Sequence, residues 1–148
     1  MANHIGANNA NEVIFTPNAT HSINQVAAGI NWKQGDVVIT SDREHNSNLV
    51  PWLQQSPSGL KLQTVKSRAD NSFDIEAFEA ACAEAGDSLK LVSLVHVGNL
   101  DGVEIPIADA SKIAHDYGAI VHVDGAQSAP HMPINVEELG CDLFSFSP

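Results

Sequence analysis

The chain has 148 residues, a formal net charge of −11 at pH 7 and seven Lys and Arg residues in total. This length is enough for one hydrophobic core, and the acidity argues against nucleic acid or an anionic membrane as a partner. No apolar run approaches the ~20 residues that span a bilayer. The two cysteines, Cys82 and Cys141, have neither metal-ligand nor disulfide spacing, so we expect a reducing, cytoplasmic compartment.

The first half of the chain alternates between strand and helix patterns. Short apolar runs predict strands at residues 13–16, 37–40 and 61–65. From Thr20 to Ile30 the apolar residues recur at helical spacing, and a second, shorter helix is predicted over residues 47–55.

The second half continues the alternation. Asp74 is a good N-cap and Gly86 a good stop for an alanine-rich helix at residues 75–85. The elements expected after it are a strand at 89–97, a helix at 106–117, a strand at 119–123, a helical turn at 136–139 and a strand at 142–146. Strands that alternate with helices predict an α/β fold, with a largely parallel sheet and helices on both faces.

Asp124 directly follows the strand predicted at residues 119–123 and precedes Gly125. In open α/β sheets, ligands bind just beyond the carboxyl ends of the strands. A carboxylate at that place can keep the pyridine nitrogen of pyridoxal phosphate protonated, so that the ring accepts carbanion electrons. The structural alternative is that Asp124 accepts a backbone N–H of the following loop.

His122 and Asp124 form an H-x-D pattern on one strand, where alternate residues share a face. Two such side chains can meet one metal ion. The sequence offers no companion cluster with ligand spacing, so we expect no metal.

Four other polar residues lie where predicted strands end or a predicted helix begins. A helix N-terminus offers unpaired N–H groups to an anion, so Thr20 is a candidate anion ligand or a plain helix cap. His45 stands in a polar loop, where a lone histidine is more often a surface residue. Asn99 and Gln127 follow apolar strands, and their alternative role is turn formation.

Five motifs occur in order at residues 15–24, 44–52, 97–99, 124–131 and 141–148. Together they resemble the class V aminotransferase family of pyridoxal-phosphate enzymes, and within it the cysteine desulfurase and selenocysteine lyase branch. The first motif resembles the family's phosphate-binding turn, the second its ring-stacking segment and the last its approach to the Schiff-base lysine. The resemblance implies part of the large domain of the fold type I transferases, with pyridoxal 5'-phosphate as cofactor.

The resemblance also implies that seven residues contact this cofactor: Ala19, Thr20, His45, Asn99, Asp124, Gln127 and Ser147. The phosphate would be bound by the backbone of Ala19 and by the hydroxyl groups of Thr20 and Ser147. Many relatives carry a second hydroxyl residue where this chain has Ala19, so one hydroxyl contact is expected to be lost.

The remaining contacts would hold the ring. His45 would lie flat on it, and Asp124 would pair with its protonated nitrogen in a dry site. Asn99 and Gln127 would hydrogen-bond its phenolic oxygen. His45 and Asp124 are therefore the expected catalytic residues.

The matching motifs cover only part of the family's large domain. The resemblance implies that residues 1–148 form a partial cofactor-binding domain, without the preceding N-terminal segment or the C-terminal domain. The Schiff-base lysine would follow Pro148 within two residues. None of the lysines of this chain matches its motif: Lys33, Lys61, Lys66, Lys90 and Lys112.

The expected parent is an enzyme that removes sulfur or selenium from cysteine or selenocysteine and leaves alanine. The resemblance implies a small amino-acid substrate, a sulfur-acceptor protein and a homodimer. One alternative is another class V reaction, namely transamination, epimerisation or kynurenine cleavage. The other is a non-catalytic α/β remnant that binds a phosphate-bearing ligand.

Overall fold

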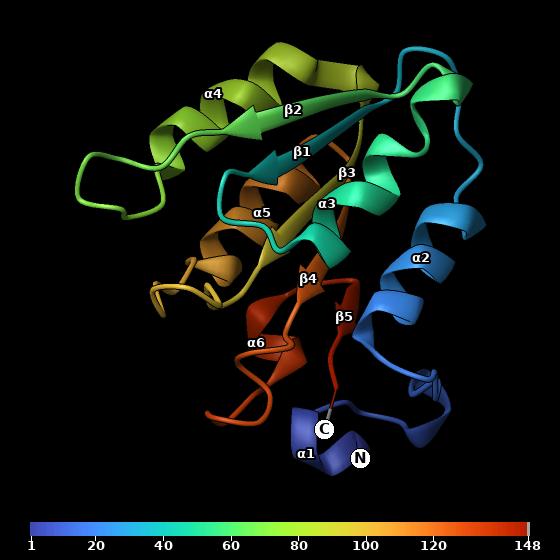
Figure 1. Cartoon of the computed structure of the whole chain (residues 1–148), viewed down its shortest axis with the longest axis vertical. Helices are drawn as coiled ribbons and strands as arrows, with labels where there is room; N and C mark the ends of the chain where they lie inside the picture. Colours follow the sequence, from blue (N-terminus) through green and yellow to red (C-terminus); the bar gives the residue numbers. More distant parts are fainter. Residues whose placement is uncertain (148) are drawn as a thin grey trace.

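A single five-stranded sheet organises the computed structural model, which describes residues 1–147 (Figure 1). The strands are β1 (Val37–Ser41), β2 (Lys61–Val65), β3 (Leu89–Val95), β4 (Ile120–Asp124) and β5 (Leu143–Ser145). Their order is β2-β1-β3-β4-β5, and every neighbouring pair is parallel. The predicted parallel sheet is confirmed, and the strand order reverses between β1 and β3.

Six α-helices lie among the described residues. They are α1 (Ala2–Ile5), α2 (Ala19–Gly29), α3 (Asn46–Leu53), α4 (Ile75–Ala85), α5 (Ile107–Asp116) and α6 (Val136–Leu139). Three short 3-10 turns are η1 (Ala10–Glu12), η2 (Ser56–Ser58) and η3 (Gly86–Ser88). Helix α4 has the predicted bounds, because the Asp74 side chain accepts the N–H of Ala77 and Gly86 ends the helix. Helix α1 and turn η1 were not predicted.

The strand predicted at residues 13–16 is wrong. Turn η1 ends at Glu12 with Val13 as its C-cap, and the next two residues, Ile14 and Phe15, are 80% and 82% exposed. Thr16 instead donates its hydroxyl hydrogen to the carbonyl of Asn18. An apolar run makes a strand only where a neighbouring strand satisfies its backbone groups, and this run has no such neighbour among residues 1–147.

Helices cover both faces of the sheet, as predicted (Figure 1). Helices α4 and α5 pack on one face over an apolar core to which Phe78, Val92 and Val121 belong. Helices α2 and α3 pack on the other face, where Ile23 and Trp52 are fully buried. A parallel sheet needs this double cover because both of its faces are apolar.

The face under α2 and α3 also contains buried polar side chains. Those of Asn48, Ser93, His122 and Ser145 are at most 2% exposed. Because side chains alternate along a strand, His122 and Asp124 of β4 point to this face, whereas Val121 and Val123 point to the apolar core under α5.

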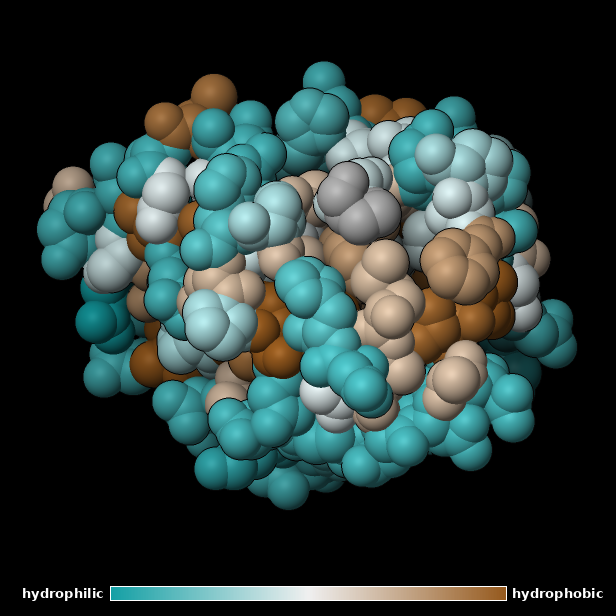
Figure 2. Space-filling model, turned by 90° about the horizontal axis from the view of Figure 1, so that it is seen from below, coloured by the Kyte–Doolittle hydropathy of each residue, from teal (hydrophilic) through white to brown (hydrophobic). Residues whose placement is uncertain are grey.

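The surface carries both hydrophobic and hydrophilic residues. On the side seen from below, hydrophobic residues reach the surface between hydrophilic ones (Figure 2). Among the residues that the structure describes, no helix has the length and apolar character to cross a membrane.

Candidate functional site

A cleft of about 250 Å³ opens at the carboxyl ends of β1, β3, β4 and β5. Its wall is completed by the first residues of α2 and α3. The cleft thus spans the β1–β3 position where the strand order reverses, which is where open α/β sheets bind ligands. All seven residues expected to contact a cofactor line it: Ala19, Thr20, His45, Asn99, Asp124, Gln127 and Ser147.

The α2 end of the cleft presents hydrogen-bond donors. Helix α2 is capped by Asn18, whose side chain accepts the N–H of His21 at 2.8 Å. Thr20 is therefore not the cap, and its exposed side chain lies at the cleft. The Ala19 N–H donates to the hydroxyl oxygen of Ser147 at 3.1 Å, which brings two of the expected phosphate ligands together. A helix N-terminus with neighbouring hydroxyl groups is a good site for an anion.

Asp124 lies at the floor of the cleft and is 2% exposed. Its Oδ1 atom accepts the Ala126 N–H at 3.0 Å, so the loop contact considered as a structural role is present. Burial raises the pKa of the Asp124 carboxyl, while the Ala126 N–H and nearby His45 oppose the rise. A Cβ atom at position 125 would collide with the ring of Phe144, so a larger residue than Gly125 would require that ring to move.

His45 is the N-cap residue of α3, and this role was not predicted. Its Nδ1 atom accepts the Ser47 N–H at 3.1 Å and lies 2.7 Å from the Ser47 hydroxyl. A nitrogen that accepts a hydrogen bond carries no hydrogen, so the neutral ring is protonated at Nε2. The ring is exposed at the edge of the cleft, with its orientation set by the cap.

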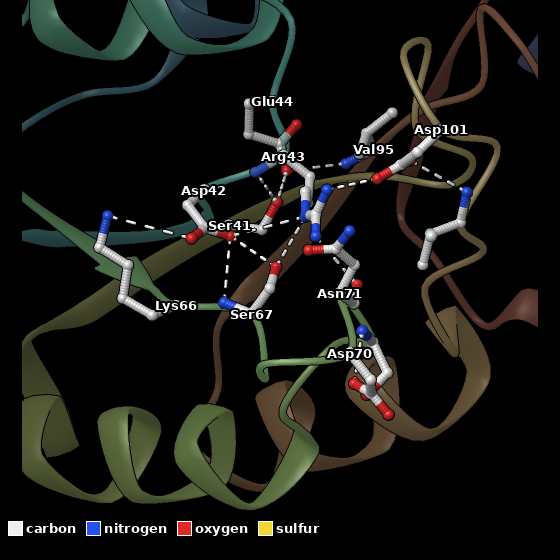
Figure 3. A network of polar contacts seen from close by, with 12 residues as sticks. Ser41, Asp42, Arg43, Glu44, Lys66, Ser67, Asp70, Asn71, Val95 and Asp101 are labelled. Atoms are coloured by element: carbon white, nitrogen blue, oxygen red, sulfur yellow. Dashed lines mark hydrogen bonds and ion pairs between the residues drawn. The ribbon is translucent and has the colours of Figure 1, made fainter.

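The loop that carries His45 is anchored by charged contacts (Figure 3). The Arg43 guanidinium reaches the hydroxyl of Ser67 at 2.8 Å, the carbonyl of Asn71 at 3.1 Å and the carboxylate of Asp101. Asp101 belongs to the same loop as Asn99. Arg43 thus ties the loops after β1, β2 and β3 to one another.

Glu44 holds the same loop to the sheet. Its Oε1 atom accepts the Ser41 hydroxyl at 2.5 Å and the Val95 N–H at 3.0 Å, and its Oε2 atom accepts the Asn48 amide at 2.6 Å. Burial raises the pKa of Glu44 to about 7, although all three donors oppose the rise. Sequence reasoning missed Glu44, because it lies in the loop before α3 and its partners Ser41, Asn48 and Val95 are brought together only by the fold.

The His122 side chain is fully buried between two serine hydroxyl groups. Its Nδ1 atom lies 2.9 Å from the Ser93 hydroxyl and its Nε2 atom 3.0 Å from the Ser145 hydroxyl. Both ring nitrogens are thus engaged by hydroxyl groups. Within residues 1–147, no three His, Cys, Asp or Glu side chains are grouped as metal ligands.

Comparison with known proteins extends these observations. The model of the family "Aminotransferase class-V" matches residues 1–148. A probable cysteine desulfurase of Halalkalibacterium halodurans is 42% identical over 147 residues, which cover 97% of this chain and 36% of that protein. A cysteine desulfurase of Escherichia coli is 35% identical over 147 residues, covering 97% of this chain and 36% of that protein. This chain spans about a third of the length of the curated relatives that it matches.

Solved structures agree with the sequence matches. The apo structure of a cysteine desulfurase from Thermococcus onnurineus superposes with a TM-score of 0.91 at 39% identity, covering 99% of this chain and 36% of that one. The cysteine desulfurase CsdA from Escherichia coli superposes with a TM-score of 0.90 at 32% identity. The match covers 99% of this chain and 37% of that one. These structures confirm the expected fold type I architecture. Pro148, next to the position expected for the lysine, lies outside the described residues.

Proposed function

This chain belongs to the class V aminotransferase family, and on that premise we propose that its cleft binds pyridoxal 5'-phosphate. The observation that carries the proposal is the buried carboxylate of Asp124 at the floor of the cleft. Within residues 1–147 no Lys or Arg side chain pairs with it. A protonated ring nitrogen is the kind of partner that such a carboxylate lacks.

The two ends of the cleft suit the two ends of this cofactor. At one end, the Ala19 N–H and the hydroxyl groups of Thr20 and Ser147 would hold the phosphate. At the other end, the His45 ring, oriented by its bond to Ser47, would cover the pyridine ring and exclude water. When bound, the cofactor supplies an electron sink for carbanion chemistry on an amino acid.

Three side chains would set the charge of the ring. Asp124 would keep the ring nitrogen protonated, which makes the ring a better electron acceptor. Asn99 and Gln127 line the cleft with exposed amides that would donate to the phenolic oxygen. The catalytic residues of this proposal are His45 and Asp124.

We propose that the full-length protein is a cysteine desulfurase-like enzyme. It would take the sulfur of cysteine, or the selenium of selenocysteine, onto a cysteine thiol and release alanine. The names of the relatives, at 35–42% identity over this segment, support the assignment. Burial raises the pKa of Cys82 to about 12 and that of Cys141 to about 11. Neither thiol would be ionised at neutral pH, so the accepting thiol is assigned to another part of the protein.

The wider assembly is part of the same proposal. Residues 1–148 would form part of the cofactor-binding large domain of a homodimer that passes sulfur to an acceptor protein. The exposed side chains of Ile14 and Phe15 support an interface with further protein. Both cysteines are free thiols, which supports a reducing, cytoplasmic compartment.

The test is made on the purified full-length protein. Borohydride reduction followed by peptide mass spectrometry is expected to find one pyridoxyl group, on a lysine outside residues 1–148. An adduct on Lys33, Lys61, Lys66, Lys90 or Lys112 would contradict the proposed arrangement. Supplied with cysteine, the enzyme is expected to form alanine in equal amount to the sulfur released. A 2-oxo acid as the product would identify a transaminase, and no turnover of cysteine by the cofactor-loaded protein would contradict the desulfurase assignment.

A further inference from the structure

A continuous chain of hydrogen bonds runs beneath the cleft, on the sheet face covered by α2 and α3. It links Glu44 to Ser22 through four side chains that are at most 2% exposed: Asn48, Ser93, His122 and Ser145. The successive distances are 2.6, 2.7, 2.9, 3.0 and 2.8 Å. We call this set the buried polar chain. Its members come from α2, α3, β3, β4, β5 and the loop before α3.

Glu44 sets the direction of the first half of the buried polar chain. An ionised carboxylate can only accept hydrogen bonds, so the Asn48 amide nitrogen must face it and the Asn48 Oδ1 atom must face Ser93. The single hydroxyl hydrogen of Ser93 then goes to Oδ1 at 2.7 Å. The Ser93 oxygen is left as an acceptor, and the His122 Nδ1 atom, 2.9 Å away, must carry the hydrogen between them.

The second half follows from the charge of His122. Complete burial lowers the pKa of His122 to about 3, so the ring is neutral at neutral pH and carries one N–H. With the hydrogen on Nδ1, the Nε2 atom accepts from the Ser145 hydroxyl. Ser22 then donates to Ser145 at 2.8 Å. With Glu44 ionised, each hydrogen of the buried polar chain therefore has one position.

The buried polar chain begins and ends close in sequence to residues that line the cleft. Glu44 directly precedes His45, and its carboxylate joins the end of β1, helix α3 and strand β3. At the other end, Ser145 is two residues from Ser147. A neutral His122 supplies no positive charge to Asp124 on the same strand face, so the Asp124 carboxylate stays available to a cation in the cleft.

We propose that Glu44 is a positioning residue whose ionised carboxylate fixes the direction of the buried polar chain and holds His122 as the Nδ1–H tautomer. This role deepens the proposed function, on which it rests only for the identity of what the cleft binds. The direction of the chain is a property of the fold and is measurable without cofactor.

The variant that tests the proposal is Glu44→Gln. Glutamine keeps the size of the side chain, and its oxygen can take the Ser41 and Val95 donors. Its amide nitrogen then donates to Asn48, which must turn its own oxygen towards position 44. The Asn48 amide would face Ser93, the Ser93 hydroxyl would donate to Nδ1 of His122, and the hydrogen of the ring would move to Nε2. One isosteric change is thus expected to reverse every bond of the chain.

Nitrogen-15 NMR of the full-length apo-protein, with labelled histidine, measures the outcome directly. Protonated and unprotonated ring nitrogens resonate in separate regions of the spectrum. His122 is assigned by the loss of its signals in His122→Asn. The spectra are taken about two pH units above the Glu44 pKa of about 7. The control is Glu79→Gln, which changes an exposed carboxylate on α4 across the sheet.

We expect the Nδ1–H form in the wild type and in Glu79→Gln, and the Nε2–H form in Glu44→Gln. An Nε2–H ring in the wild type would overturn the proposal, whether or not the variant folds. The same tautomer in the wild type and in a folded Glu44→Gln would show that Glu44 does not set the direction. Since the protein is free of cofactor, these outcomes do not depend on the proposed enzyme activity, which the product assay tests separately.

Discussion

The two faces of the sheet are packed by different chemistry. Under α4 and α5, the core is a continuous set of apolar side chains around Phe78, Val92 and Val121. Under α2 and α3, a smaller apolar cluster around Trp52 lies beside the buried polar chain from Glu44 to Ser22. Asp124, which points to this second face, lines the cleft.

The two faces contribute differently: one mainly stabilises the fold, and the other mainly orients side chains. Apolar burial is strong but non-directional, so it holds the sheet and helices together without fixing the angle of any one group. Hydrogen bonds have narrow geometry, and buried polar groups that lose a partner are costly. The face beside the cleft therefore positions side chains, and the opposite face supplies most of the apolar packing. Substitutions on the apolar face should mainly change the free energy of unfolding, and substitutions at the cleft should mainly change cofactor binding and turnover.

The largest effect is expected at the cleft itself. In the full-length enzyme, Asp124→Ala should lower turnover about 10²–10⁴-fold, because a preorganised electrostatic group is lost. Some cofactor should remain bound, because the contacts to the phosphate are intact. Single-turnover kinetics, together with absorbance for cofactor content, measures both. The control is the exposed Asp87→Ala. Near-normal single-turnover rates in Asp124→Ala would remove this residue from its assigned role.

A large-to-small substitution on the apolar face should lower the free energy of unfolding. Phe78 is fully buried, with its ring centre 5.6 Å from that of Phe73. Phe78→Ala is expected to lower the free energy of unfolding by about 3–5 kcal/mol, because it leaves a cavity. Urea denaturation of the full-length protein measures the change. Leu100→Ala, at a side chain that is 94% exposed, should have little effect. A loss in Phe78→Ala no larger than in this control would contradict the assignment of the core.

A substitution at the phosphate end of the cleft should lower the affinity for pyridoxal phosphate. Thr20→Ala removes one hydrogen bond to a charged acceptor, and such a bond contributes about 1.5–3 kcal/mol. His45→Ala should instead mainly change the absorbance and turnover of the bound cofactor, because the ring loses its cover. Titration of the apo-enzyme with pyridoxal phosphate distinguishes the two, with Thr64→Ala on β2 as the control. If affinity is unchanged in Thr20→Ala, the hydroxyl is not a phosphate ligand.

The smallest effect is expected from cutting the buried polar chain. Ser93→Ala leaves the Asn48 oxygen and the His122 Nδ1 atom without their shared partner. The expected loss of stability is about 1–3 kcal/mol, the cost of unsatisfied buried polar groups. Urea denaturation, compared with the exposed Ser88→Ala, measures it. A Ser93→Ala protein as stable as the control would indicate that these contacts contribute little.

Local sequence signals determined much of the fold. The apolar runs of β1 to β4 and the capped helix α4 were predicted because strand alternation, an N-cap aspartate and a terminal glycine act within a few residues. The same local reasoning failed at residues 13–16, because a strand also requires a partner. It placed the start of α2 at Thr20, whereas Asn18 caps the helix.

The sequence also identified residues of the cleft. Asp124 was predicted from its place after a buried strand, and resemblance to family motifs added residues such as His45 and Ser147. Parallel strands bring their carboxyl ends to one edge, so motifs that follow different strands meet there. This is why segments spread over most of the chain line one cleft.

Tertiary structure alone decided the partners of the buried polar groups. Ser93 and Asn48 are 45 residues apart, and Ser22 and Ser145 are 123 residues apart. A serine within a strand, such as Ser93, and a histidine within a strand, such as His122, carry no local sign of the groups to which they hydrogen-bond. Their hydrogen bonds are set by the strand order β1-β3-β4-β5 and by the packing of α2 and α3 on one face. Hydrogen-bond direction depends on atoms within 3 Å of one another, and such proximity is established only when the chain has folded.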